Sequence, residues 1–288
     1  MISDQNAFPF ANWRLIVSPA APGGWNMAVD EAILLAVGRQ DVPPTLRLYA
    51  WEPACLSLGY AQPAAEVDQA ALEAHGWQLV RRPTGGRAIL HTDELTYSVC
   101  GPQDDPRLSG SVLESYRNLA QALLQALHLL KIPAAAQNRP ALPPHAPERR
   151  PAGNPSNPVC FEVPSDYEIT VLGKKLIGSA QARRREGVLQ HGSFPLRGDL
   201  RRITQVLVFV SEGEREQAAA RLLERATTAE AVLGEPLSFE VASEAFIAAF
   251  ESALNLRLEE GELTPGEIRN AERLVAEKFT HPSWTYKV

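Results

Sequence analysis

A cysteine and a lysine fifteen residues apart are the side chains of this sequence best suited to covalent chemistry. Cys160 ends a proline-rich stretch, and Lys175 lies in a glycine-containing run at 173–181. A thiolate is a far stronger nucleophile than a thiol, and a nearby ammonium lowers the pKa of a thiol. The pair therefore predicts acyl transfer through a thioester on Cys160. The alternative is that this lone cysteine is a small buried apolar residue, which is at least as common.

The other cysteines do not suggest a metal centre or a disulfide framework. Cys55, Cys100 and Cys160 are odd in number and far apart, and the six histidines do not cluster with them. This spacing predicts free thiols, no bound metal and the reducing cytoplasm. No apolar run approaches the roughly 18 residues of a membrane span, and residues 1–11 lack the order of a signal peptide. We therefore expect no membrane partner.

Charge is distributed unevenly along the chain. The formal net charge is −6, and residues 212–288 carry 15 Glu against 8 Lys and Arg. Arginines cluster in the less acidic first part, at 81–87, 149–150, 183–185 and 201–202. These clusters are either solvated surface charge or a positive rim that steers an acidic protein partner. The acidic balance and the lack of a recognised motif argue against a nucleic-acid partner.

Strand and helix patterns alternate through the first two thirds of the chain. Strand patterns lie at 13–17, 46–51, 56–60, 78–82, 87–91, 94–100, 167–172, 175–177 and 188–194, and helical patterns lie at 25–38, 68–75 and 111–131. The short links between the three strands at 78–100 predict hairpin pairing. A turn is predicted at Glu186 and Gly187.

The sequence changes character at about residue 202, where helical and acidic patterns begin. Helical periodicity is seen at 211–233, 242–254 and 265–279. This shift predicts a catalytic domain at 1–205 and an acidic helical region at 206–288. Before it, nine prolines between 133 and 164 exclude a helix or a central strand and predict an active-site loop that delivers Cys160.

Two glycine motifs accompany the Cys–Lys pair. In the first, at 81–91, adjacent glycines lie between two strands, where backbone can approach a ligand closely. The second contains Lys175 and continues into Gly178-Ser179-Ala180-Gln181. Alone, the first predicts only a hairpin and the second a lysine-bearing hairpin with a bulge. Neither is a Walker A loop or a dinucleotide-binding fingerprint.

Taken in order, the three motifs resemble those of the lipoate–protein ligase and octanoyltransferase family. They read Arg-Arg-x-x-Gly-Gly-x-Ala-x-x-His, Cys-Phe-Glu-x-Pro-x-Asp-Tyr-Glu and Gly-Lys-Lys-Leu-x-Gly-Ser-Ala-Gln. The resemblance runs from about residue 13 to 202, and more weakly beyond. Because Cys160 precedes Lys175, the chain is most similar to octanoyltransferases of the LipM type. The LipB type carries its cysteine after the lysine motif, and the ATP-dependent ligases need no such nucleophile.

This resemblance implies both a fold and a reaction. The fold is α/β (α+β), with a mixed sheet packed by helices as in biotin and lipoate protein ligases, and a small helical C-terminal region. The reaction transfers octanoyl from octanoyl-acyl carrier protein, through a Cys160 thioester, to a lysine of a lipoyl-domain protein such as the glycine cleavage H protein. Exchange between thioesters is nearly isoenergetic, so no ATP or other cofactor is expected. The loop at 133–159 departs from the family, because it is longer and richer in proline.

The resemblance also implies roles for individual residues. Lys175 matches the register of the family's lysine, favours the thiolate and stabilises the oxyanion, whereas Lys174 is expected to face solvent. The residues expected to line the acyl pocket are Arg82, Gly85, Gly86, His91, Ser179 and Ala180. For His91 the alternative is a purely structural histidine at a strand end.

Other functions remain open at this stage. An ATP-dependent lipoate–protein ligase would use Lys175 for adenylate chemistry and leave Cys160 incidental. An octanoyl amidotransferase would use the same thioester but take octanoyl from H protein. A noncatalytic module that binds a lipoyl domain or a fatty acid would require neither the nucleophile nor the neighbouring amine.

Overall fold

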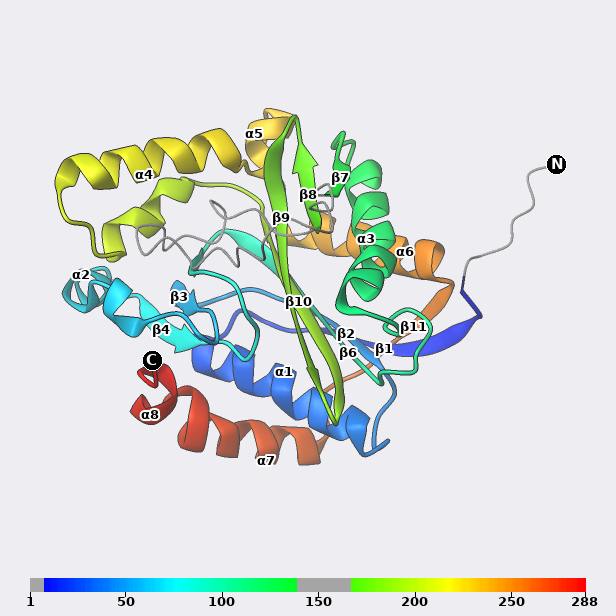
Figure 1. Cartoon of the computed structure of the whole chain (residues 1–288). Coiled ribbons are helices and arrows are strands. Elements are labelled where there is room, and N and C mark those ends of the chain that lie inside the picture. Colours follow the sequence, from blue (N-terminus) through cyan, green and yellow to red (C-terminus); the bar gives the residue numbers. More distant parts are fainter. Residues whose placement is uncertain (1–7, 139–166) are drawn as a thin grey trace, which may run out of the picture.

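The computed structural model describes residues 8–138 and 167–288, and Figure 1 shows a long twisted sheet flanked by helices. The large sheet has eight strands in the order β11-β1-β2-β6-β10-β9-β8-β7. These strands are β1 (Ala11–Val17), β2 (Thr45–Tyr49), β6 (Glu94–Gly101), β7 (Ala135–Asn138), β8 (Tyr167–Val171), β9 (Lys174–Arg184), β10 (Gly187–Pro195) and β11 (Leu256–Glu260). Strand β1 is parallel to both of its neighbours, β11 and β2. All other neighbouring pairs in this order are antiparallel. The expected mixed sheet packed by helices is confirmed.

The middle of the large sheet is formed by β6 and β10, in which every residue is buried. One face is covered by α1 (Gly23–Gly38) and α7 (Pro265–Leu274), and the other by α3 (Val112–Leu129) and α6 (Phe239–Leu254), as Figure 1 shows. Two separate apolar clusters result, one on each face. A polar side chain on β6 or β10 is therefore removed from water and needs a partner.

Helix α1 is buried almost all round, because it lies between the sheet and α7. Thirteen of its sixteen residues are buried, whereas a surface helix would bury only one stripe. Within this apolar sequence Asn26, Asp30 and Glu31 are buried polar exceptions. Such residues require hydrogen-bonding or charged partners in the neighbouring strands.

A smaller sheet of three strands lies beside the large one, with β3 (Cys55–Leu58) between β4 (Gln78–Arg81) and β5 (Ile89–His91). The predicted hairpins in this region are wrong. β4 runs parallel to β3 and β5 antiparallel to it, so β4 and β5 never pair, and β6 pairs with β2 and β10 instead. The link at 82–88 therefore crosses the end of β3. A Cβ atom on Gly59 would lie 1.8 Å from the Gly86 carbonyl oxygen, so this crossing requires glycine.

The remaining helices either pack near the small sheet or come after β10 of the large sheet in sequence. They are α2 (Gln69–Ala74), the 3₁₀ segments η1 (Ala64–Glu66) and η3 (Leu200–Val206), α4 (Glu212–Arg225), α5 (Ala229–Leu233), the π-helical segment η4 (Val275–Phe279) and α8 (Pro282–Thr285). The helix predicted at 211–233 is divided, because Ala226 is extended and the Thr228 side chain caps a new helix. The predicted turn is found one residue earlier, at 185–186, because Gly187 already pairs with Arg184. The helix within 111–131 is confirmed.

Residues beyond 205 add a strand to the large sheet and make hydrogen bonds to the small sheet. Strand β11, which the charged sequence Leu-Arg-Leu-Glu-Glu did not predict, pairs with β1 at the sheet edge. The buried guanidinium of Arg81 donates hydrogen bonds to the carbonyl oxygens of Trp284 and Thr285 in α8. A division at 205/206 stays a prediction, and extensive contacts join its two sides.

Among residues 8–138 and 167–288, no helix combines the length and apolar character needed to cross a membrane.

Candidate functional site

One cavity is lined by all residues of the predicted site that the structure describes. Its volume is about 260 Å³, against about 30 Å³ for a second hollow beside β5, so it is the better candidate for a ligand. Its walls include every predicted residue that the structure describes: Arg82, Gly85, Gly86, His91, Lys175, Ser179 and Ala180. Cys160 lies outside the described residues.

Lys175 enters the cavity from β9. Its side chain is buried, and Nζ lies 3.0 Å from Oε1 of Glu168 on β8. Because successive side chains of a strand point to opposite faces, the neighbouring Lys174 is exposed, and its Nζ donates to the Leu223 carbonyl. The structure thus places one ammonium in the cavity wall and the other on the surface.

Arg82 organises the glycine loop rather than offering a free charge to the cavity. Its guanidinium is buried and donates to the carbonyl oxygens of Gly85 and Arg87 at 2.8 and 2.7 Å, and to both the carbonyl and the hydroxyl oxygen of Ser57. Gly86 has φ of 92°, a conformation that favours glycine. The two glycines therefore line the cavity with backbone atoms, and the hydrogen bonds from Arg82 fix the position of this backbone.

His91 is fixed on three sides. Its ring stacks on Trp51 with centroids 3.9 Å apart, Nε2 lies 2.8 Å from Ser57 Oγ, and Nδ1 lies 2.8 Å from Oε1 of Glu94. Burial alone would raise the pKa of Glu94, but His91, Thr96 and Ser193 lower it below its usual value. The ionised carboxylate holds the imidazole against Trp51, so His91 has both a structural role and a surface on the cavity.

Ser179 and Ala180 line the cavity from β9. Ser179 Oγ lies 2.7 Å from the Tyr97 hydroxyl, which accepts a hydrogen bond from Gln190. Burial raises the pKa of Tyr97 to about 12, so it stays a neutral phenol. Apolar surface comes from Met27, Tyr49, Trp51 and Ile89. The cavity thus combines apolar side chains with the ammonium of Lys175.

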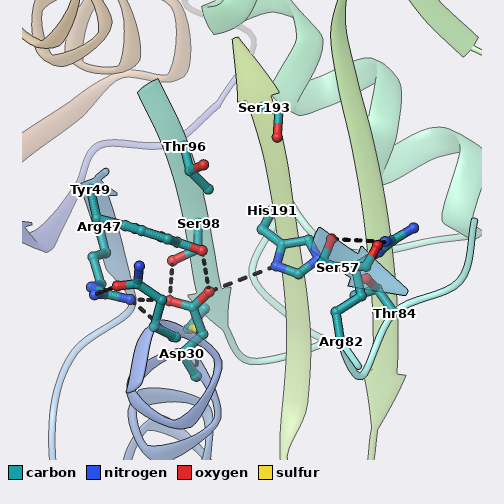
Figure 2. A network of polar contacts seen from close by, with 12 residues as sticks. Asp30, Arg47, Tyr49, Ser57, Arg82, Thr84, Thr96, Ser98, His191 and Ser193 are labelled. Atoms are coloured by element: carbon teal, nitrogen blue, oxygen red, sulfur yellow. Dashed lines mark hydrogen bonds and ion pairs between the residues drawn. The ribbon is translucent and has the colours of Figure 1, made fainter. Parts of the chain in front are cut away.

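Sequence reasoning missed a buried polar network behind this cavity, which Figure 2 shows. Its centre is Asp30 on α1, and it reaches the cavity through His191 on β10. His191 contacts Thr84, which directly precedes the glycine pair. An Asp in the middle of an apolar helix was the available sequence signal, but nothing local showed which residues it would meet.

The described residues hold no group of three or more His, Cys, Asp or Glu side chains arranged to bind a metal ion. The cavity lining combines apolar side chains with the buried ammonium of Lys175, which suits recognition of an apolar chain that carries a carbonyl group.

Several proteins with similar sequences are octanoyltransferases. Octanoyltransferase LipM of Kyrpidia tusciae is 44% identical, over 96% of this chain and 98% of that protein. Octanoyltransferase LipM of Bacillus subtilis is 36% identical over the same shares of the two chains.

Solved structures show the same fold. A lipoate-protein ligase A bound with ATP gives a TM-score of 0.75 at 25% identity, covering 96% of this chain and 99% of that one. A bi-partite lipoate protein ligase from Thermoplasma acidophilum gives 0.76 at 24% identity, covering 96% of each chain. The family described as the lipoyl protein ligase A/B catalytic domain matches residues 22–251. With most of its length matched and relatives of this identity, the chain belongs to the lipoyl protein ligase A/B catalytic domain family.

Proposed function

We propose that this protein is an octanoyltransferase of lipoate biosynthesis. The observation that carries the proposal is the position of Lys175, whose buried ammonium lines the same cavity as Ser179, Ala180 and the Gly85–Gly86 loop. The octanoyltransferases that share 36–44% of its sequence support the reaction class.

In the first half of the reaction, the Cys160 thiolate attacks the thioester of octanoyl-acyl carrier protein. A new bond joins the octanoyl carbonyl carbon to the sulfur of Cys160, the carrier's carbon–sulfur bond breaks, and the carrier leaves as a thiolate that takes up a proton from water. One thioester replaces another, so the step needs no ATP. The Lys175 ammonium stabilises the oxyanion of the tetrahedral intermediate.

In the second half, a lysine of the acceptor attacks the octanoyl-Cys160 thioester. The amine loses a proton, an amide forms and the Cys160 thiolate is restored. An amide is more stable than a thioester, which drives the sequence forward. The apolar residues Met27, Trp51 and Ile89 bind the octanoyl chain meanwhile, and the glycine loop packs beside it.

The partners proposed for this site are octanoyl-acyl carrier protein as donor and the glycine cleavage H protein, or another lipoyl-domain protein, as acceptor. The clustered arginines at 183–185 and 201–202 suit acidic partners of this kind. We place the reaction in the cytoplasm, where the free thiols of the chain would stay reduced.

An ATP-dependent lipoate–protein ligase is the second candidate, because a ligase bound with ATP shares the fold. Its similarity of 25% is well below that of the octanoyltransferases, and a ligase requires no acylated cysteine. An amidotransferase would share Cys160 and Lys175 but use octanoyl-H protein as donor.

Intact-protein mass spectrometry tests these assignments. The enzyme is mixed with octanoyl-acyl carrier protein, or separately with octanoyl-H protein, in the absence of ATP. We expect a hydroxylamine-labile octanoyl adduct on Cys160 from the carrier protein. An adduct only from octanoyl-H protein would identify an amidotransferase. No adduct from either donor, with transfer of free octanoate or lipoate once ATP and magnesium are added, would overturn the proposal.

A further inference from the structure

A chain of buried polar side chains connects helix α1 with the glycine loop of the cavity. Asp30 accepts hydrogen bonds from Arg47 Nη1, the Tyr49 hydroxyl and Ser98 Oγ, each at 2.8 Å. Burial would raise the pKa of Asp30, but His191 and Arg47 lower it below its usual value. Asp30 is therefore a carboxylate and offers only acceptor atoms to its neighbours.

The carboxylate sets the tautomer of His191. Nδ1 of His191 lies 3.7 Å from Asp30 Oδ2, so the proton of a neutral ring is favoured on Nδ1. Burial lowers the pKa of His191, which keeps the ring neutral. Nε2 is then an acceptor, and Thr84 Oγ1 at 2.6 Å must be the donor. The Asp30 carboxylate on one side of the ring thus dictates the direction of the hydrogen bond on the other side.

This hydrogen bond joins two walls of the cavity that belong to different sheets. His191 is on β10 of the large sheet, where it lies opposite Ala180 of β9. Thr84 belongs to the loop that connects two strands of the small sheet, and its carbonyl also accepts from the Tyr60 amide. Figure 2 shows His191 between Asp30 on one side and the Thr84 segment on the other.

We propose that Thr84 and His191 are positioning residues that fix the distance between the glycine loop and the cavity wall formed by β9, which carries Lys175. Asp30 holds the ring of His191 in place. The part of this inference that concerns turnover rests on the proposed octanoyl transfer. The part that concerns the loop does not, because it can be measured on the resting protein.

Two substitutions of Thr84 separate the hydroxyl from the shape of the side chain. Thr84→Val keeps the shape and removes the donor, whereas Thr84→Ser keeps the donor. We expect the amides of residues 85–87 to exchange hydrogen about tenfold faster in Thr84→Val than in wild type, and at the wild-type rate in Thr84→Ser. Thr204→Val is the matched control, because Thr204 is equally buried but bonds within η3.

Two substitutions of His191 separate its ring nitrogens. The amide of Gln reaches the position of Nε2 and can still accept from Thr84, whereas the shorter Asn reaches only the position of Nδ1, beside Asp30. We expect loop exchange near the wild-type rate in His191→Gln and faster exchange in His191→Asn. The double variant Thr84→Val/His191→Asn should exchange no faster than either single variant, because both remove the same bond.

Donor kinetics complete the test. A loosened wall binds the acyl chain less well in the ground and transition states alike, so Thr84→Val should raise KM for the octanoyl donor about tenfold while kcat stays near wild type. Exchange and KM that are the same in Thr84→Val, Thr84→Ser and wild type would overturn the inference. Absence of octanoyl transfer in wild type would overturn the proposed function instead, while the exchange comparison would still decide the role of Thr84 and His191.

Discussion

Lys174 and Lys175 are neighbours in sequence and lie on opposite faces of β9, so their ammonium groups occupy different environments. Nζ of Lys175 is buried 3.0 Å from Glu168 in the cavity wall, whereas Nζ of Lys174 donates to the Leu223 carbonyl at the surface. The pair forms an internal control, because the same substitution can be made at adjacent positions with different expected results.

Replacing Lys175 with Met should reduce octanoyl transfer about 10²–10³-fold, since the oxyanion loses its nearest cation. Lys174→Met should retain transfer close to that of wild type. Steady-state transfer to H protein measures both, and circular dichroism checks that both proteins are folded. Equal activity of the two variants would remove Lys175 from the mechanism.

Only one of the three cysteines should react rapidly in the folded protein. Burial raises the pKa of both Cys55 and Cys100, and neither side chain is accessible, whereas the proposed nucleophile is Cys160. Iodoacetamide followed by peptide mass mapping should label Cys160 first, and the other two only after unfolding. Cys160→Ala should show no rapid labelling and no octanoyl adduct. Rapid labelling of Cys55 in the native protein would contradict this assignment.

Gly59→Ala should damage both stability and transfer, because the new Cβ atom would lie 1.8 Å from the Gly86 carbonyl and push the loop away. We expect a loss of about 1–3 kcal/mol in the free energy of unfolding, as for other overpacked sites. Gly213→Ala is the control, since among residues 8–138 and 167–288 the nearest atom outside the local helix backbone is Ser211 Oγ at 3.9 Å, and the position is helical. It should be neutral or slightly stabilising. Urea unfolding measures both variants, and a stable, active Gly59→Ala protein would show that the crossing is not tight.

Acidification should weaken the fold through His191. Burial lowers the pKa of His191 in the folded protein, whereas in the unfolded chain it binds a proton near its ordinary pKa of about 6.5. Stability rises with pH wherever the unfolded state binds more protons, so the free energy of unfolding should fall as pH decreases below about 6.5. Asp30 and Glu94, with lowered pKa values, add to the loss only near and below the ordinary carboxyl range of about 4.

The comparison of wild type with His191→Gln isolates this effect. Urea unfolding at about pH 7.5 and about pH 5.5 should show a larger loss for wild type, because Gln does not titrate. An equal loss in the two proteins would assign the acid sensitivity to other groups.

Local sequence information identified two motifs that form part of the cavity wall, but not its apolar residues or the network behind it. Arg82, the glycine pair and Lys175 stand in contiguous motifs with fixed spacing, so they could be recognised without a fold. Asp30, Thr84 and His191 come from three separate segments, and they meet only in the fold, where α1 packs against β10 and the loop after β4 reaches His191. The hairpin prediction at 78–100 failed for the same reason, because β3, which separates β4 from β5, precedes both in sequence.

The hydrogen bonds from Arg81 to Trp284 and Thr285 constrain the order in which the enzyme can fold as it is synthesised. Arg81 adjoins Arg82, which organises the glycine loop, and its own guanidinium is held by carbonyl groups that follow it by 203 and 204 residues. On the ribosome, those carbonyl groups are synthesised long after the strand they support. A nascent chain interrupted before residue 284 would leave Nε and Nη2 of Arg81 without these acceptors, while Nη1 would keep its bonds to the carbonyl oxygens of Gly59 and Gln62. Incomplete copies should therefore be less stable and more readily degraded.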